Sequence, residues 1–424
     1  MIRIVFLLAL LWSQARVASS QAAPPPRTRA DSLKADSARV ADSLAIVREL
    51  ESQPQASTSR PPTTQAGPSN TRLLPDISTV GDLVADLSPK GSTQEDASRF
   101  GIREVEVALQ AAVDPYFRGE VFLGFSDAEG VAVEQAFLTA TALPWGLEVR
   151  LGRLLMPVGK QNTTHRHDLH SIEYPYVLQQ LLSPEGLKGT GVYASRIFSP
   201  FHFYQEVIVT AVDRVGEAPA DLRADAPPNK KLSGLGYSAR LRNYWDLSSS
   251  TNLEISGSAI TGLREQPLSG LGEVNAVNAR QTLYGIDATI RWRPLRQGLY
   301  KSFILQAEAL RQANDRDPAL PQGAAGAGRD YAGPLRDFSG WYAFARWQTG
   351  RRTYLGARVD GVQDATYDGR STRAASAYWE FFPSEFSKLV AGYERVKPPA
   401  GTSATNRVIL QATFALGPHK PHPF

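Results

Sequence analysis

From about residue 76 onward, hydrophobic and polar residues alternate along the chain. In the segment QTLYGIDATIRWRP, Tyr284, Ile286 and Trp292 fall on one face, and Asp287 and Arg291 fall on the other. Successive side chains of a β-strand point to opposite faces, so this alternation predicts strands with one apolar and one polar face. Aromatic residues stand at both ends of the apolar face, as in strands that cross both interfaces of a membrane.

About 16 segments show this pattern, and each has the ~10–14 residues that a tilted transmembrane strand needs. They lie near residues 76–87, 102–113, 116–126, 130–143, 147–156, 189–199, 202–213, 233–245, 250–262, 281–293, 300–312, 338–348, 353–362, 373–382, 387–396 and 403–416. The predicted fold class is therefore all-β: a transmembrane, antiparallel, up-and-down β-barrel of about 16 strands, or 14 if a weak pair does not form.

The connections between these segments alternate in length. Short turns such as Asp114-Pro115 and Pro383 to Glu385 alternate with mostly longer connections such as 157–188 and 313–337. Outer-membrane barrels have short periplasmic turns and long extracellular loops, so the alternation indicates this class. With both termini in the periplasm, the loop 157–188 belongs to the outer side. We expect it to fold into the lumen and narrow it.

The first 75 residues do not show the alternation of hydrophobic and polar residues. Residues 1–20 resemble a secretory signal peptide, with an apolar core from Ile4 to Trp12 and a small-residue cleavage site at Ala18 to Ser20. Residues 21–75 are predicted to be a low-complexity periplasmic extension that carries a short helix at 30–50. That helix is either a lone periplasmic helix or a short coiled coil. The barrel is then expected over residues 76–424, in the outer membrane of a Gram-negative bacterium.

Composition narrows the possible functions. The chain has no Cys among its 424 residues, which excludes disulfides, thiolate metal sites and Cys nucleophiles. The formal charge of +4 is a mild excess for this length and does not indicate a nucleic-acid partner. The mean hydropathy of −0.26 fits a barrel whose lipid-facing side chains are averaged with a polar lumen.

Charged residues recur on the polar faces of the predicted strands. Rings of arginine attract anions in anion-selective pores, whereas a mixture of both charges can form internal ion pairs that hold the wall. Both readings remain open for this set. The expected pore-lining residues are Arg118, Glu134, Arg150, Arg196, Arg240, Arg242, Asp287, Arg291, Arg293, Arg346 and Arg358.

Three of the six histidines of the chain lie in the loop segment HRHDLHSIEYPY. His165, His167 and His170 offer imidazole ligands, so Zn or another divalent metal is a candidate ligand of this loop. Their spacings do not match a pair of ligands one helical turn apart, and the alternative is a polar loop without metal. No catalytic motif stands out, and we expect no enzyme and no resident cofactor other than this candidate metal.

Three stretches resemble Gram-negative outer-membrane porins of the phosphate-selective type and their uncharacterised relatives. They are VEQAFLTATALPWGLEVRLGRLLMPVGKQN at 133–162, EGLKGTGVYASR at 185–196 and the ending ATFALGPHKPHPF. The resemblance implies that the barrel-assembly machinery reads the C-terminal strand and Phe424. The histidine-bearing segments are also similar to those of zinc-regulated, TonB-dependent receptors, but the chain has no room for a globular plug and too few strands for that class.

The sequence therefore predicts an outer-membrane porin for passive diffusion of small polar or anionic solutes, constricted by the loop 157–188. The alternative is a receptor barrel that captures a divalent metal or chelate through residues 165–173. The expected partners are outer-membrane lipid and small polar solutes, with a homotrimer as one candidate assembly.

Overall fold

The computed structural model describes residues 75–94, 97–126, 130–182, 186–201, 203–213, 215, 232–263, 280–314, 338–363, 371–398 and 403–417. Sixteen strands account for most of these residues. They are β1 (Asp76–Asp86), β2 (Phe100–Ala112), β3 (Phe117–Ser126), β4 (Gly130–Ala140), β5 (Leu147–Leu155), β6 (Lys188–Phe198), β7 (Tyr204–Val212), β8 (Gly236–Ser248), β9 (Thr251–Leu263), β10 (Arg280–Trp292), β11 (Phe303–Asn314), β12 (Phe338–Gln348), β13 (Thr353–Gln363), β14 (Ser371–Ser384), β15 (Ser387–Lys397) and β16 (Thr405–Leu416).

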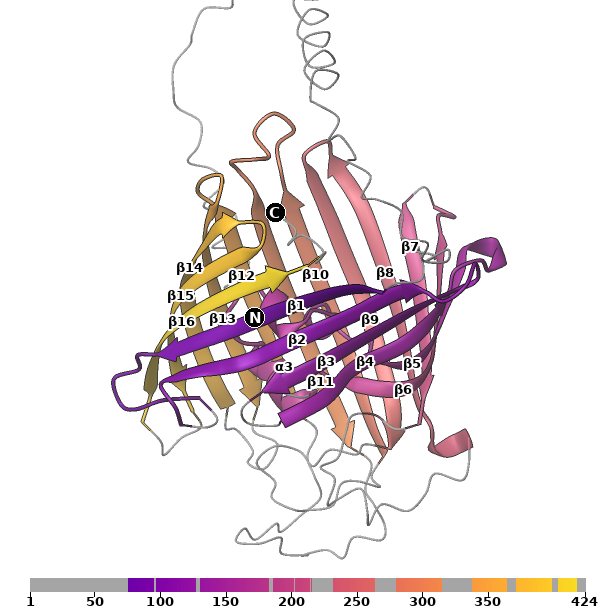
Figure 1. Cartoon of the computed structure of the whole chain (residues 1–424), viewed down its shortest axis with the longest axis horizontal. Coiled ribbons are helices and arrows are strands. Elements are labelled where there is room, and N and C mark those ends of the chain that lie inside the picture. The colour runs from indigo at the N-terminus through magenta and orange to yellow at the C-terminus, as the bar shows by residue number, and fades with distance from the viewer. Residues whose placement is uncertain are drawn as a thin grey trace, which may run out of the picture. The chain divides into compact units, whose positions relative to one another are not determined.

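The strands form one closed antiparallel barrel, shown in Figure 1. Each strand pairs with its neighbours in sequence, and β1 pairs with β16 from Thr79↔Leu416 to Asp86↔Ile409 to complete the ring. Closure leaves no strand edge without a partner, which matters in a medium that offers no hydrogen bonds to the backbone. The prediction of about 16 strands is confirmed, and the alternative of 14 is wrong.

The two faces of the wall differ as the alternation predicts. On β10, Asp287 is 1% exposed, whereas Tyr284 is 54% and Ile286 is 59% exposed. Exposed aromatic side chains occur near both ends of the outer face, for example Trp341 and Trp347 at opposite ends of β12. An apolar outer band with aromatic residues at both rims is typical of a barrel that is embedded in a membrane.

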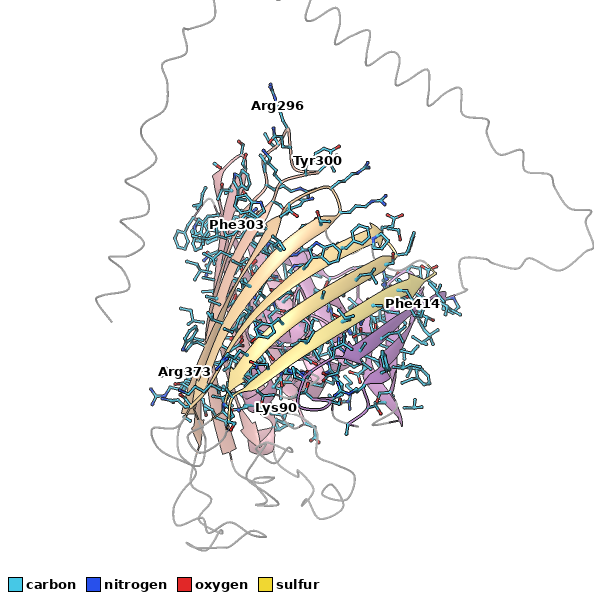
Figure 2. The ribbon with its side chains drawn as sticks, turned by 90° about the vertical axis from the view of Figure 1, so that its left-hand side faces the viewer. Lys90, Arg296, Tyr300, Phe303, Arg373 and Phe414 are labelled. Atoms are coloured by element: carbon cyan, nitrogen blue, oxygen red, sulfur yellow. The ribbon has the colours of Figure 1, made fainter. Side chains whose placement is uncertain are left out.

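The connections divide into a short-turn end and a long-loop end. Residues 249–250 join β8 to β9, and residues 385–386 join β14 to β15, whereas residues 156–187 separate β5 from β6. Figure 2 shows Arg296 and Tyr300 at one end of the barrel and Lys90 and Arg373 at the other. Because the strand number is even, β1 begins and β16 ends at the short-turn end.

Among the described residues, no helix is both long enough and apolar enough to cross a membrane. The predicted signal peptide (1–20), the helix at 30–50 and the C-terminal residue Phe424 lie outside the described residues. The extension 21–75 lies outside them as well, apart from its last residue.

Candidate functional site in the barrel lumen

The connection between β5 and β6, residues 156–187, folds into the barrel and is called the inner loop below. Its base is closed by a hydrogen bond of 2.8 Å from the N–H of Met156 to the carbonyl of Leu187. The amide of Asn162 donates to the carbonyls of both residues, over 2.7 and 3.1 Å. These bonds satisfy buried backbone groups, so the loop enters the lumen as a folded unit. Residues 183–185 lie outside the described part of the chain.

The first part of the inner loop, at Gly159 and Lys160, is fixed to the wall formed by β9 and β11. The N–H of Gly159 donates to Oγ of Ser258 over 3.2 Å, and the N–H of Lys160 donates to Oε2 of Glu308 over 3.1 Å. The ammonium group of Lys160 lies 2.6 Å from the carboxylate of Glu254. Backbone and side chain of the same segment are therefore both held by inward-facing residues of the barrel.

A short helix attaches the loop to the wall by apolar contacts. Helix α3 (Tyr176–Leu181) buries Val177, Leu178 and Leu181. These side chains belong to one apolar cluster with the inward-facing residues Tyr342 and Phe344 of β12. The helix begins after Pro175, whose fixed φ suits the entry to a helix. The hydrophobic core of the molecule thus lies inside the barrel, between the inner loop and the wall.

On another side of the lumen, His165 joins the inner loop to β2 and β4. Its Nδ1 lies 2.7 Å from Oε2 of Glu106, and its Nε2 lies 2.9 Å from the side-chain amide of Gln135. Burial favours the neutral imidazole, but the hydrogen bond and charge of Glu106 outweigh it and raise the pKa of His165 to about 9. The imidazole is consequently charged at neutral pH and forms an ion pair.

Glu173 of the inner loop lies among three arginines. Its carboxylate is 2.8 Å from Arg166 of the same loop, 3.3 Å from Arg103 of β2 and 3.7 Å from Arg407 of β16. Burial opposes its charge, but the guanidinium groups of Arg166, Arg103 and Arg407 lower the pKa of Glu173 to about 2. The carboxylate is therefore ionised at any physiological pH and anchors the inner loop to β2 and β16, the two strands that flank β1.

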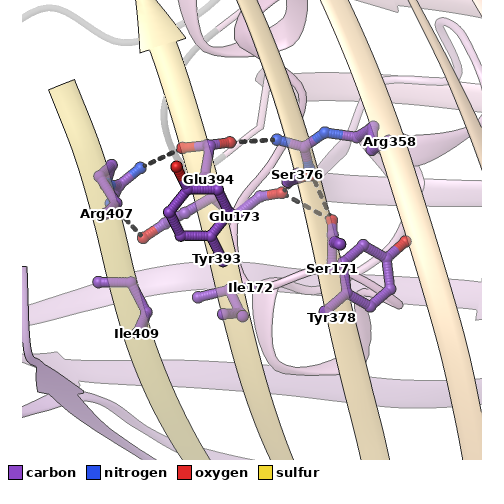
Figure 3. Close-up of a pocket in the computed structure, with 12 residues that line it drawn as sticks. Ser171, Ile172, Glu173, Arg358, Ser376, Tyr378, Tyr393, Glu394, Arg407 and Ile409 are labelled. Atoms are coloured by element: carbon purple, nitrogen blue, oxygen red, sulfur yellow. Dashed lines mark hydrogen bonds and ion pairs between the residues drawn. The ribbon is translucent and has the colours of Figure 1, made fainter. Parts of the chain in front are cut away.

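The adjoining wall extends this ionic cluster around a cavity of about 30 Å³. Figure 3 shows Glu394 between Arg358 and Arg407, with the inner-loop residue Ser171 below Arg358. Arg407 lies 2.9 Å from Glu394, and Arg358 donates to Oγ of Ser171 over 2.8 Å. On β15, the ammonium group of Lys388 donates to the carbonyls of His167 and Leu169. The inner loop is thus held by cations as well as anions of the wall.

Most deeply buried members of the predicted pore-lining set are paired with one another or with neighbours. Arg240 lies 2.9 Å from Asp287, Arg346 lies 2.8 Å from Glu380, and Arg358 lies 2.8 Å from Asp360. Lys188 forms an ion pair with Glu134. Arg240 also donates to the carbonyl of Gly159 in the first part of the inner loop. At these positions the structure favours wall-stabilising ion pairs over a free arginine ladder.

A second group of predicted residues remains accessible. Arg118, Arg150, Arg242 and Arg291 have side chains that are 46%, 35%, 34% and 35% exposed. Arg118 and Arg291 lie next to the short turns at the ends of β3 and β10, Arg150 lies in the half of β5 nearer a short turn, and Arg242 lies at the middle of β8. The accessible cations of the set therefore lie between the middle of the barrel and its short-turn mouth.

Two predicted pore-lining residues lie elsewhere. Arg196 pairs with Leu147 and Val207 and shares the outer parity of Val192, which is 43% exposed. It faces outward because it shares its strand parity with Thr190 and Val192, which are both exposed, whereas Ser195 on the other parity is buried. Arg293 follows the last residue of β10 and donates from Nε to the carbonyl of Gly298, so it belongs to a short turn.

The predicted metal ligands do not converge. The rings of His165 and His167 stack with centroids 5.5 Å apart, whereas His170 packs against Phe344 on another wall. Within the described ranges, no group of three or more His, Asp or Glu side chains is arranged to hold a metal ion. Both ring nitrogens of His165 face protein groups, as described above. The geometry gives the candidate metal no coordination sphere from these three residues.

Sequence reasoning missed several residues that hold the inner loop. The alternation of Leu389 and Ala391 on the outer face of β15 would have assigned Lys388 to the lumen. Arg103 was harder to find, because it is the extra residue of a β-bulge where Asp82 pairs with Glu104 and Leu83 pairs with Ile102. A bulge changes the parity of a strand and leaves no reliable signal in the sequence.

No protein-family model matches the chain. Among curated proteins, an uncharacterized protein of Aquifex aeolicus (strain VF5) is 27% identical over 343 residues, which cover 77% of this chain and 70% of that protein. This identity supports common ancestry over most of the barrel and gives no activity.

Solved structures of outer-membrane proteins share the fold. A loop-deletion mutant of OmpT from Vibrio cholerae matches with a TM-score of 0.51 and 12% identity, and 81% of this chain covers 99% of that chain. The trimer form of OmpT matches with a TM-score of 0.50 and 10% identity, covering 81% and 100% of the two chains. OprB of Pseudomonas putida matches with a TM-score of 0.50 and 10% identity, covering 81% and 94%. These likenesses show the barrel fold, and the narrower resemblance to the phosphate-selective porins stays a prediction.

Proposed function

We propose that this chain is a passive channel of the Gram-negative outer membrane for small polar or anionic solutes, and that the inner loop is its constriction. One observation carries the proposal. The inner loop crosses the lumen and is attached to Glu106 on β2, Glu254 on β9 and Lys388 on β15. A loop fastened to several walls at once narrows the lumen at a fixed place.

The preference for anions rests on unequal exposure within ion pairs at the short-turn mouth. Arg291 is 35% exposed and its partner Glu254 only 3%, while Arg242 is 34% exposed and its partner Glu206 is 11%. A solute at this mouth therefore meets more of the cations than of the carboxylates. Accessible arginines lining a pore attract anions.

Conductance of the full chain in planar lipid bilayers tests the channel. We expect discrete conductance steps, and a reversal potential under a KCl gradient that indicates preference for chloride. A variant in which residues 163–182 are replaced by a short Gly-Ser linker should conduct several-fold more, because the constriction is removed. Absence of conductance in both proteins contradicts the channel, and equal conductance in both contradicts the constriction.

Two finer points belong to the same proposal. The OmpT neighbour was solved in a trimer form, which supports a homotrimer as the assembly of this chain in the membrane. Chemical cross-linking in native membranes should then give a ladder that ends at three copies. Recognition of Phe424 by the barrel-assembly machinery predicts that deleting this residue slows assembly into the outer membrane.

The alternative of a metal receptor has less support. His165 is paired with Glu106, and His170 lies against Phe344, so metal binding would require the loop to rearrange. Calorimetric titration with Zn²⁺ should show no site that is lost on replacing His165, His167 and His170 together by alanine.

A further inference from the structure

A pocket of about 660 Å³ lies between the inner loop and the short-turn ends of β7 to β10. Its volume falls within the ~300–1,000 Å³ range of small-molecule sites. The residues that give it its chemistry are Lys160, Tyr204, Arg242, Tyr244, Glu254 and Arg291. Lys160 belongs to the inner loop, so the pocket lies directly beside the proposed constriction.

The charges of the pocket are arranged around one buried carboxylate. Glu254 is 3% exposed and lies 2.6 Å from Lys160 and 3.4 Å from each of Arg242 and Arg291. Three cations therefore contact this buried anion, and Arg242 has a second buried partner, Glu206, at 2.8 Å. Asp246, the other acidic residue of the lining, lies near the short-turn end of β8. The inner part of the pocket thus has an excess of positive charge.

The two guanidinium groups retain capacity for a ligand. Arg291 uses Nη1 for Glu254, and Arg242 uses Nε for Glu254 and Nη1 for Glu206. Within the part of the chain that the structure describes, Nη2 of Arg242 and Nη2 of Arg291 donate no hydrogen bond. Guanidinium N–H groups match the planar geometry of a carboxylate better than an ammonium group does.

Two tyrosine rings form the next part of the pocket. Tyr204 and Tyr244 are adjacent across β7 and β8, with centroids 6.4 Å apart and planes at 82°. The Tyr204 hydroxyl donates to Glu206, over 3.2 Å, which fixes the ring beside Arg242. Ring edges and faces of this kind favour a flat, apolar body over a compact, fully hydrated ion.

We propose that this pocket is a binding subsite for small organic carboxylates, with the carboxylate on Arg242 and Arg291 and a flat apolar body against Tyr204 and Tyr244. The inference rests on the proposed channel function and names the class of solute that binds at the short-turn mouth of the channel. The subsite holds the solute on the short-turn side of the inner loop. It concentrates such solutes at the constriction without a conformational change.

Calorimetric titration of the full chain in detergent tests the subsite, with benzoate as the probe. Benzamide is the uncharged isostere, acetate lacks the flat body, and inorganic phosphate is a compact anion. We expect benzoate to bind in the millimolar range or tighter and at least about tenfold more tightly than the other three, because hydrogen bonds to charged groups are strong and the rings add contact area.

Three variants locate the binding. Replacing Arg242 and Arg291 together by glutamine should weaken benzoate binding at least about tenfold, whereas Arg118→Gln removes a lumen cation at the same end of the barrel, on β3, and should leave it unchanged. Replacing Tyr204 and Tyr244 together by alanine keeps all ion pairs of the pocket. This variant should weaken benzoate binding and leave acetate binding unaltered.

The results separate this subsite from the channel itself. Conductance without benzoate binding overturns the subsite and leaves the channel intact. Phosphate binding as tight as that of benzoate overturns the assigned solute class. Benzoate binding that survives both the arginine and the tyrosine double variants overturns the location. Benzoate binding by a protein that does not conduct supports the pocket and contradicts the channel.

Discussion

At the scale of single residues, Gly159 occupies a position that other residues would strain. Its φ is +61°, and a Cβ added there would lie 1.6 Å from Oε1 of Glu308. That carboxylate is held in place, because its other oxygen accepts hydrogen bonds from Lys160 and Tyr342. We predict that Gly159→Ala releases the first part of the inner loop from β9 and β11. About 1–3 kcal/mol of backbone strain adds to the steric clash. Faster tryptic cleavage after Arg166 in detergent measures this release.

Gly130 provides the matched control for this prediction. Its φ is +77°, but an added Cβ would have no neighbour within 4 Å. Gly130→Ala therefore imposes similar backbone strain without the clash, and cleavage after Arg166 should remain at the rate of the unaltered protein. Equal acceleration in both variants would mean that cleavage after Arg166 reports a general loosening of the protein and not the release of the inner loop at Gly159.

The ion pair of His165 with Glu106 makes the attachment of the inner loop depend on pH. The pKa of His165 is about 9 in the folded protein, above its ordinary value of 6.5. The pair therefore contributes its full stability below about pH 6.5, and this contribution is lost as the pH rises through 9. We predict that tryptic cleavage of the inner loop, measured relative to a control substrate of the protease, accelerates as the pH rises from about 7 to about 9.5. His165→Gln and Glu106→Gln should each abolish this dependence, and a dependence that persists in Glu106→Gln contradicts the assignment.

At the scale of elements, helix α3 attaches to the wall through its apolar side, and its first residue Tyr176 adds hydrogen bonds to Asp360 and Glu394. Leu178 is 1% exposed, within the cluster that includes Tyr342 of β12. Leu178→Ala should cost about 2–5 kcal/mol, and we predict that the loss affects docking of the inner loop and not the barrel. Hydrogen–deuterium exchange should rise in peptides from the inner loop, while the strands stay protected. Gln180→Ala, on the same helix but outside the cluster, should change neither, and equal loss of protection in the strands would contradict a separable loop.

The strands could be predicted from the sequence because alternation follows directly from strand geometry. On β13, Leu355 and Val359 face outward and Arg358 faces inward, as the pattern predicts. The contacts of the inner loop could not be predicted in this way. Glu173 meets Arg407, which is more than two hundred positions away, and such a pairing depends on how the barrel closes. Whether a side chain faces inward follows from its own strand, whereas the residue that it contacts depends on the whole fold.

At the scale of the whole molecule, the end of the barrel that carries the accessible arginines is also the end at which the chain enters and leaves the barrel. Arg291 lies near a short turn and lines the same pocket as Arg242, and β1 begins and β16 ends on the same side. If the short turns face the periplasm, a solute that enters from outside passes the inner loop first and the arginine-lined mouth second. The order of these two features along the path is therefore set by the orientation of the barrel in the membrane.

That orientation can be tested with single cysteines, because the chain has none of its own. We predict that Lys90→Cys, in the connection between β1 and β2, reacts on intact cells with a maleimide that carries a polyethylene glycol chain too large for the lumen. Ser249→Cys, in the turn between β8 and β9, should react only after the outer membrane is permeabilised. Both positions are exposed, so a difference between them reports the side of the membrane and not burial. The unaltered protein should remain unlabelled throughout. Labelling of Ser249→Cys alone on intact cells would place the arginine-lined mouth outside, and the proposed carboxylate subsite would then be the entrance of the channel and not its exit.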